Sequence, residues 1–184
     1  MYVPGELTTE RIVLRRWRDA DVDPLAAINA DPEVMQHFVA PLTREQTARG
    51  IAGYEASFAQ CGFGPWAVEV VASGELIGYI GLLSVRFDAH FTPAVHLTTK
   101  FAARTWRQHY ASEAAYEVLR DGFDRVGLVE VVAFTSRRNE PSWRGMAALG
   151  MTHDDADDFA HPDLAEGHPL RDQVLYRIRN PLLG

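Results

Sequence analysis

Three consecutive segments between residues 94 and 135 constrain the fold of this chain more than any other feature. Ala94 to Ala102 alternates apolar and polar side chains, which predicts a strand, and Leu128 to Thr135 predicts a second strand. Between them, apolar residues at helical spacing predict a helix. They are Ala111, Ala114, Ala115, Val118, Leu119 and Phe123. Strands joined through a helix run parallel in one sheet, so we expect a βαβ crossover.

The other segments predict antiparallel strands and further helices around this unit. We expect strands over residues 11–17, 65–72, 76–85 and 173–179, and helices from about residue 21, over 43–59 and from Asn139 to Gly150. Ser73-Gly74-Glu75 joins two of the strands and is typical of a hairpin. The pattern predicts an α+β (mixed α/β) fold with flanking helices. At 184 residues without an internal repeat, we expect a single domain over residues 1–184.

The charge balance limits the partners of the chain. With 25 acidic and 18 basic residues, the net charge of -7 argues against general binding to nucleic acid or to an anionic membrane. No secretory leader is visible, and the longest apolar stretch, Leu76 to Val85, is too short to span a bilayer. The single cysteine, Cys61, favours a reducing cytoplasm. No Cys/His cluster has the ligand spacing of a structural zinc site, so we expect no bound metal. Dimers are the commonest assembly of soluble proteins, so a homodimer is one expected state.

One segment departs from this acidic composition. Between Asp88 and Glu113 there is no carboxylate, although the segment is rich in basic and titratable side chains. These are His90, His96, Lys100, Arg104, Arg107 and His109. The segment covers the end of a strand and the approach to a helix N-terminus, whose free amides and dipole favour an anion. It therefore predicts a phosphate-bearing ligand, and the alternative interpretation is a solvated basic loop.

Several motifs along the chain together carry a resemblance to a known family. Residues 106–114 read W-R-Q-H-Y-A-S-E-A, where one branch of that family reads W-G-x-G-Y-A-T-E-A. Further matches lie at residues 7–15, 66–68, 77–82, 131–135, 139–142, 149–151 and 158–170. On these motifs the chain resembles the GNAT superfamily of acyl-CoA-dependent N-acetyltransferases, in the branch related to ribosomal-protein alanine N-acetyltransferases. The resemblance implies a mostly antiparallel twisted sheet with a parallel, splayed strand pair.

The resemblance also implies where acetyl-CoA binds. Its pantetheine arm would lie along the strand from Ala94, between the splayed strands, and its pyrophosphate on the loop before the helix. The implied cofactor-binding residues are Thr99, Phe101, Arg104, Arg107, Gln108, His109, Tyr110, Ala111, Ser112 and Asn139. Arg107 and His109 replace glycines of the branch, so His109 could crowd the pyrophosphate, or both could donate charge-assisted hydrogen bonds to it. We favour retained binding, because the helix dipole does not depend on these glycines.

Three residues are candidates for the chemistry of acetyl transfer. His96 stands where the branch often carries glutamate, and an ordinary histidine pKa of about 6.5 suits a general base. Its alternative interpretation is a packed polar residue on a half-buried strand. Glu69 is a second base candidate, although it also fits the solvent face of its strand. By resemblance Ser142 lies near the sulfur as a proton donor or hydrogen-bond partner, while Asn139 and Ser142 also fit helix capping.

The expected activity is direct transfer of acetyl from acetyl-CoA to a primary amine, on a protein N-terminus or a small molecule. Cys61 lies outside the matched segments, so nothing indicates an acetyl-enzyme. The alternative is a catalytically degenerate GNAT fold that binds CoA or another anionic metabolite as a sensor or interaction module. A longer acyl chain also stays open. The carboxylates between His153 and Pro169 form either an acidic rim for an ammonium substrate or a solvated connection.

Overall fold

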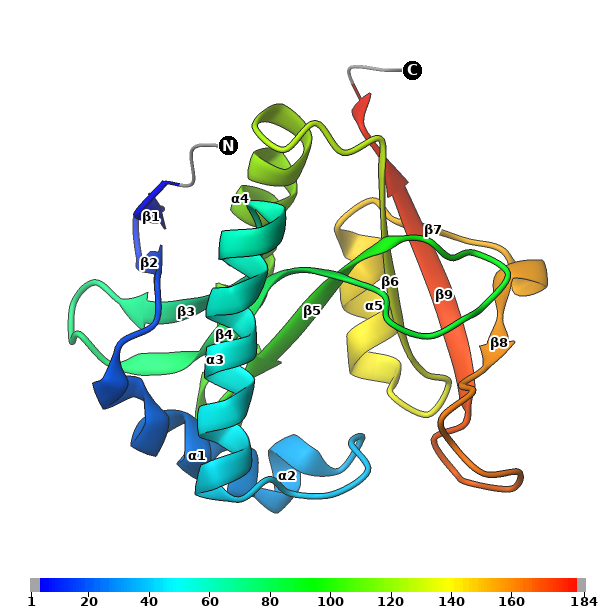
Figure 1. Cartoon of the computed structure of the whole chain (residues 1–184), viewed down its shortest axis with the longest axis horizontal. Coiled ribbons are helices and arrows are strands. Elements are labelled where there is room, and N and C mark those ends of the chain that lie inside the picture. The colour runs from blue at the N-terminus through cyan, green and yellow to red at the C-terminus, as the bar shows by residue number, and fades with distance from the viewer. Residues whose placement is uncertain (1–3, 182–184) are drawn as a thin grey trace.

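The computed structural model describes residues 4–181, whose centre is a nine-stranded sheet (Figure 1). Its strands are β1 (Glu6–Thr8), β2 (Ile12–Arg15), β3 (Pro65–Val70), β4 (Leu76–Ser84), β5 (Val95–Phe101), β6 (Glu130–Ser136), β7 (Thr152–His153), β8 (Phe159–Ala160) and β9 (Asp172–Arg179). The order is β1-β2-β3-β4-β5-β6-β9-β7, with β8 also beside β9. Every pairing is antiparallel except β5 with β6, which is parallel. The expected mixed fold and its βαβ crossover are confirmed.

The helices flank this sheet, with α3 in front of it and α5 behind it in Figure 1. They are α1 (Val22–Ala30), α2 (Pro32–Met35), α3 (Arg44–Cys61), α4 (Tyr110–Asp124) and α5 (Glu140–Ala148). Short 3-10 turns lie at η1 (Asp19–Asp21), η2 (Ala103–Thr105) and η3 (Asp155–Asp157). Within residues 4–181, the structure contains no helix with the length and hydrophobicity of a membrane span.

The α4 stripe fixes which way each side chain of β5 points. From Ala114 onward the stripe is buried and belongs to the same core cluster as Leu97 and Phe101 of β5, whereas Ala111 is exposed in the first turn. Because side chains alternate along a strand, His96 and Lys100 lie on the face of β5 opposite to α4. The alternation in the sequence predicted this division.

The strands β5 and β6 diverge, as the resemblance implied. Between them, the register pair of His96 with Val132 is the only one among the described residues, whereas β5 pairs with β4 along its whole length. Beyond that pair the carboxyl-terminal halves of the two strands separate (Figure 1). Since Ala102 N–H bonds back to Ile77 of β4, alternation directs the main-chain groups of Leu97 and Thr99 toward the gap.

Some short elements were not predicted. The helix α2 begins at Pro32 after Asp31, whose carboxylate accepts a hydrogen bond from the Glu33 N–H at 2.9 Å. An N-cap residue followed by proline is a start signal that could have predicted this helix. The strands β7 and β8 have two residues each, too few for an alternating pattern to show.

Candidate active site

The loop before α4 keeps a glycine-like backbone although its glycines are replaced. Arg107 has φ 62° and His109 has φ 65°, and they are the only non-glycine residues with positive φ in the described chain. This left-handed region costs an ordinary residue roughly 1–2 kcal/mol. Both side chains are exposed, and neither forms an ion pair or hydrogen bond within residues 4–181. The backbone shape of the loop is thus retained, with two cation-capable side chains added.

The first turn of α4 presents unused amides beside these side chains. The first intrahelical bond runs from the Glu113 N–H to the His109 carbonyl at 3.0 Å. The N–H groups of Tyr110, Ala111 and Ser112 therefore precede that bond and are open to a ligand. Glu113 lies in the same turn, but its carboxylate accepts from Arg11 Nε at 2.7 Å and from Thr9. An anion can therefore approach these amides without facing a free carboxylate.

Other candidate residues hold the loop in place. The Arg104 guanidinium pairs with Glu75, and the Gln108 amide donates to the Arg104 carbonyl at 2.8 Å. The Tyr110 ring lies 4.6 Å from the Arg11 guanidinium. Ser112 Oγ donates to the His109 carbonyl at 2.9 Å. These contacts explain how the strained backbone of the loop is kept.

The two candidates on β5 differ in what they offer to a ligand. Thr99 is exposed and, by alternation, directs its main-chain groups into the gap. Phe101 has its side chain in the core, and its carbonyl accepts a hydrogen bond from Trp106 Nε1 at 3.0 Å. The free edge of β5 is therefore centred on Thr99.

Lys100 does not belong to the anion site that the basic segment predicted. Its Nζ is buried, donates to Asn29 Oδ1 at 2.8 Å and lies 4.1 Å from the centre of the Phe38 ring. Burial lowers its pKa to about 8. The prediction grouped Lys100 with residues that follow it in the chain, but strand alternation turns it to the opposite face, beneath α1 and α2.

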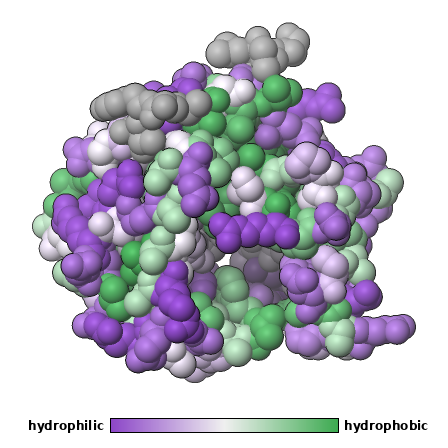
Figure 2. Space-filling view, in the orientation of Figure 1, coloured by the Kyte–Doolittle hydropathy of each residue, from purple (hydrophilic) through white to green (hydrophobic). Residues whose placement is uncertain are grey.

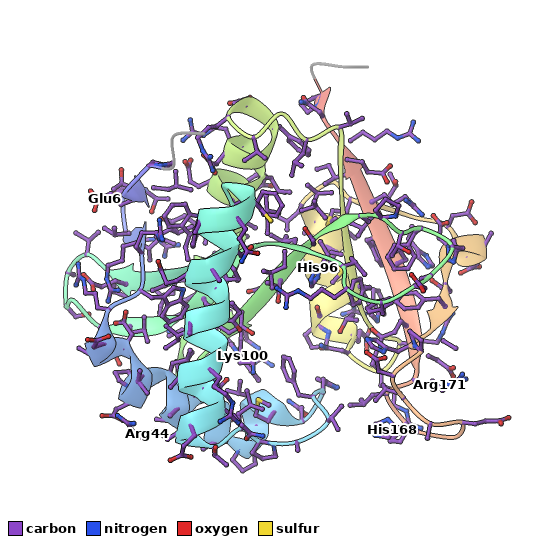
Figure 3. All side chains as sticks on the ribbon, viewed as in Figure 1. Glu6, Arg44, His96, Lys100, His168 and Arg171 are labelled. Atoms are coloured by element: carbon purple, nitrogen blue, oxygen red, sulfur yellow. The ribbon has the colours of Figure 1, made fainter. Side chains whose placement is uncertain are left out.

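His96 lies at the centre of the molecule, where β5 and β6 part (Figure 3). Its ring stacks on Phe134, with 5.0 Å between ring centres and 20° between planes. Burial lowers the pKa of His96 to about 4, so the imidazole is neutral at pH 7. Neither ring nitrogen has a hydrogen-bond partner among residues 4–181. The structure thus leaves a neutral imidazole free to accept a hydrogen bond from a substrate or a water.

The first turn of α5 holds Asn139 and Ser142. Asn139 occupies the N-cap position, but its side chain does not cap the helix and instead donates from Nδ2 to Thr135 Oγ1 at 3.0 Å. The predicted N-cap position of Asn139 is therefore confirmed, whereas the expected side-chain capping bond is not formed. Ser142 is half-buried, with its N–H on the Asn139 carbonyl at 3.1 Å. Because α4 follows β5 and α5 follows β6, both helix starts lie at the carboxyl ends of the two diverging strands.

Glu69 lies away from this gap. It is on β3, which β4 separates from β5, and its carboxylate accepts from Arg15 Nε at 2.7 Å. Arg15 also donates to both oxygens of Asp21, at 2.7 and 2.8 Å. The structure therefore places Glu69 in a buried ion-pair group that joins β2, β3 and η1.

Two cavities that the sequence did not reveal lie beside the turn after β6 and the loop before β9. One of about 390 Å³ is lined by Ser136, Arg138, His168 and Arg171 among others. The second, of about 380 Å³, lies between residues 36–39 and 168–170 and shares Arg138 and His168 with the first. Figure 2 shows a hollow in this part of the surface. No sequence pattern signals these cavities, because their walls are far apart in the chain.

The acidic residues of the 153–169 segment are largely engaged with neighbouring side chains. Asp157 bonds to Arg177 at 2.6 Å, and Asp158 bonds to His153 Nε2 at 2.8 Å and pairs with Arg137. His153, Asp155 and Asp158 bring possible metal-binding atoms within 4.8 Å of one another. Asp158 is already neutralised by Arg137, so this group is explained as an ion-paired surface cluster.

Comparison with known proteins agrees with this geometry. Residues 11–152 match the family model described as "Acetyltransferase (GNAT) domain". The chain is 30% identical over 133 residues to the Aspergillus fumigatus FsC-acetyl coenzyme A-N(2)-transacetylase, covering 68% of this chain and 56% of that protein.

Two solved structures share the fold. A Bacillus anthracis GNAT-family acetyltransferase superposes with a TM-score of 0.77 at 22% identity, covering 95% of this chain and 98% of that one. A Vibrio cholerae protein described as a putative ribosomal-protein-serine acetyltransferase gives 0.76 at 17% identity, covering 97% and 99%. The chain therefore belongs to the GNAT family of acetyltransferases, as its motifs indicated.

Proposed function

We propose that this protein is an N-acetyltransferase that moves acetyl directly from acetyl-CoA to a primary amine. The observation that carries the proposal is the loop at Arg107 and His109, which keeps left-handed backbone and leads into the free amides of residues 110–112. Amides at a helix N-terminus bind phosphate oxygens. The relative from Aspergillus fumigatus is named for acetyl coenzyme A, which supports the same donor here.

The residues at the open end of the β5–β6 gap fit the donor. The amides of Tyr110, Ala111 and Ser112 would bind the pyrophosphate, with Arg107 and His109 adding charge-assisted hydrogen bonds. The main-chain groups of Thr99 would pair with the amide groups of the pantetheine arm. Asn139 would contact the same arm from the start of α5.

The chemistry requires one proton acceptor and one donor. As the amine nitrogen bonds to the acetyl carbon and the carbon–sulfur bond breaks, the nitrogen loses a proton and the sulfur leaves as thiolate. His96 is neutral and accepts that proton, directly or through a water. Ser142 donates a hydrogen bond to the departing sulfur. Glu69, held by Arg15, has a structural role in this proposal.

The proposal also covers the domain organisation, the cellular location and the oligomeric state of the protein. Its 184 residues form a single domain, and the exposed thiol of Cys61 suits a reducing cytoplasm. A homodimer fits the base rate for soluble enzymes.

A thiol-release assay tests the proposed reaction. Acetyl-CoA is mixed with the protein and a panel of primary amines, and free CoA thiol and the acetylated amine are quantified together. We expect equal amounts of both products with at least one amine. Tight binding of acetyl-CoA with no product from any amine would instead favour the non-catalytic sensor.

A single substitution tests where the pyrophosphate binds. Ala111→Glu places a carboxylate in the exposed first turn of α4, where a negative charge favours the helix dipole and preserves folding. The same charge repels a pyrophosphate, so we expect acetyl-CoA binding to weaken at least tenfold by calorimetry, about 1.4 kcal/mol. The matched control is Tyr116→Glu, on the same helix and 56% exposed, which should bind acetyl-CoA as the wild type does. Equal affinity of the two variants would place the pyrophosphate elsewhere.

A further inference from the structure

The larger of the two cavities contains arginines that lack the ion pairs typical of this protein. In a chain of net charge -7, most arginines pair with a carboxylate. The arginines that form no close ion pair with a carboxylate in the described residues 4–181 are Arg49, Arg86, Arg107, Arg138 and Arg171. Arg107 belongs to the proposed pyrophosphate loop. Arg138 and Arg171 line the same cavity of about 390 Å³.

Both arginines lie on hydrogen-bonded backbone, Arg138 with an exposed side chain and Arg171 with its guanidinium fixed by a hydrogen bond. Arg171 is half-buried, and its Nε donates to the Leu164 carbonyl at 3.0 Å, which leaves its terminal nitrogens for another acceptor. Arg138 lies on the turn after β6, where the Arg137 N–H bonds to the Asp172 carbonyl at 2.9 Å. Arginine presents a planar set of donors that matches one carboxylate or phosphate group.

The other charges of the cavity limit what it can hold. Arg137 lines it too, but its charge is compensated by Asp158. Glu166 and Asp172 also contribute to the lining, and neither forms an ion pair with Arg138 or Arg171 within residues 4–181. These carboxylates would repel an extended polyanion. The cavity therefore suits a single small anionic group.

The position of the cavity relates it to the proposed acetyl transfer. Arg138 directly precedes Asn139, which starts α5 at the open end of the β5–β6 gap. In Figure 3, His168 and Arg171 lie across the open space from Lys100, with His96 above it. A molecule whose amine reaches the gap can extend its other end toward Arg138 and Arg171.

We propose that the acceptor is a primary amine that also carries a carboxylate or a phosphate group, which Arg138 and Arg171 bind together. This inference rests on the proposed acetyl transfer for the position of the amine. It narrows the acceptor class, since polyamines and aminoglycosides, whose ionised groups are all cationic, are disfavoured by two arginines without ion pairs.

Matched pairs of amines test the proposal without turnover. Calorimetry measures binding to the protein, alone and loaded with CoA, of phosphoethanolamine against ethanolamine and of a set of amino acids against their amides. We expect the anionic member of at least one pair to bind about tenfold more tightly or better. The pair that shows this preference identifies whether the cavity binds a phosphate or a carboxylate.

Two variants assign the preference to the cavity. The double variant Arg138→Gln and Arg171→Gln should lose the preference for the anionic member, whereas Arg49→Gln, an exposed arginine outside the cavity, should keep it. A preference that survives in the double variant, or no preference in any pair, would overturn the proposal. So would weaker acetyl-CoA binding in the double variant, because the arginines would then serve the donor. A preference in binding without thiol release would contradict only the acetyl transfer.

Discussion

His96→Phe is expected to lower kcat/KM for acetyl transfer about 100-fold. Phenylalanine keeps the ring that stacks on Phe134 but has no nitrogen to accept a proton. General base catalysis contributes roughly 100-fold to 10,000-fold, and the lowered pKa of His96, about 4, makes it a weak base at the lower end of that range. The loss corresponds to about 2.7 kcal/mol of transition-state stabilisation. His90→Phe, at an exposed position in the preceding loop, is the matched control and should keep full activity.

The pH dependence of stability and of activity tests whether His96 acts as a neutral base or only packs against Phe134. His96 takes up a proton near pH 4 in the folded protein and near 6.5 when unfolded, so the unfolded state binds more protons between these values. Stability should therefore fall as the pH drops from about 6.5 toward 4, by about 3.4 kcal/mol at most, and His96→Phe should remove that part of the slope. Activity of the wild type should show no loss attributable to His96 until the pH approaches 4. An acid limb near 6.5 that disappears in the variant would contradict this assignment.

Asp21→Ala is expected to cost about 3–5 kcal/mol of folding stability, because it leaves the buried Arg15 guanidinium without its bidentate partner. The Arg15 side chain is 7% exposed and that of Asp21 is 5% exposed. For a chain of this length, such a loss lowers Tm by about 10 °C. Thermal unfolding followed by circular dichroism measures the change.

The double variant Arg15→Leu with Asp21→Leu provides the control. It removes both charges, so we expect it to be more stable than Asp21→Ala. If the double variant lost as much stability as both single changes added together, the two side chains would act independently.

Glu69→Gln, which keeps an acceptor for Arg15, should leave kcat nearly unchanged. A large loss of kcat would return Glu69 to the catalytic candidates.

The sequence predicted those features that depend on local periodicity. Alternation along residues 95–101 gave the correct faces of β5, and the spacing from Ala114 to Phe123 gave the buried side of α4. The same alternation could have corrected the grouping of Lys100, since neighbouring residues of a strand point to opposite faces. Grouping basic residues by their distance along the chain ignored that geometry.

Features that depend on tertiary contact could not be predicted in this way. The low pKa of His96 arises from burial beside Phe134, a residue of a different strand. Arg138 and Arg171 meet in one cavity only because β6 pairs with β9 and brings their flanking loops together. The positive φ of Arg107 and His109 is likewise not signalled by the residues themselves, because the glycines that mark such a conformation are replaced at both positions.

The most direct measurement compares acetyl-CoA with S-acetyl-pantetheine in calorimetric titrations of the wild-type protein. The two share the thioester and the pantetheine arm, but only acetyl-CoA carries the pyrophosphate that the α4 amides, Arg107 and His109 are proposed to bind. We expect acetyl-CoA to bind at one site per chain and at least tenfold more tightly than S-acetyl-pantetheine. Equal affinities, or no heat of binding with acetyl-CoA, would contradict the assignment of this loop and the acetyl transfer that depends on it.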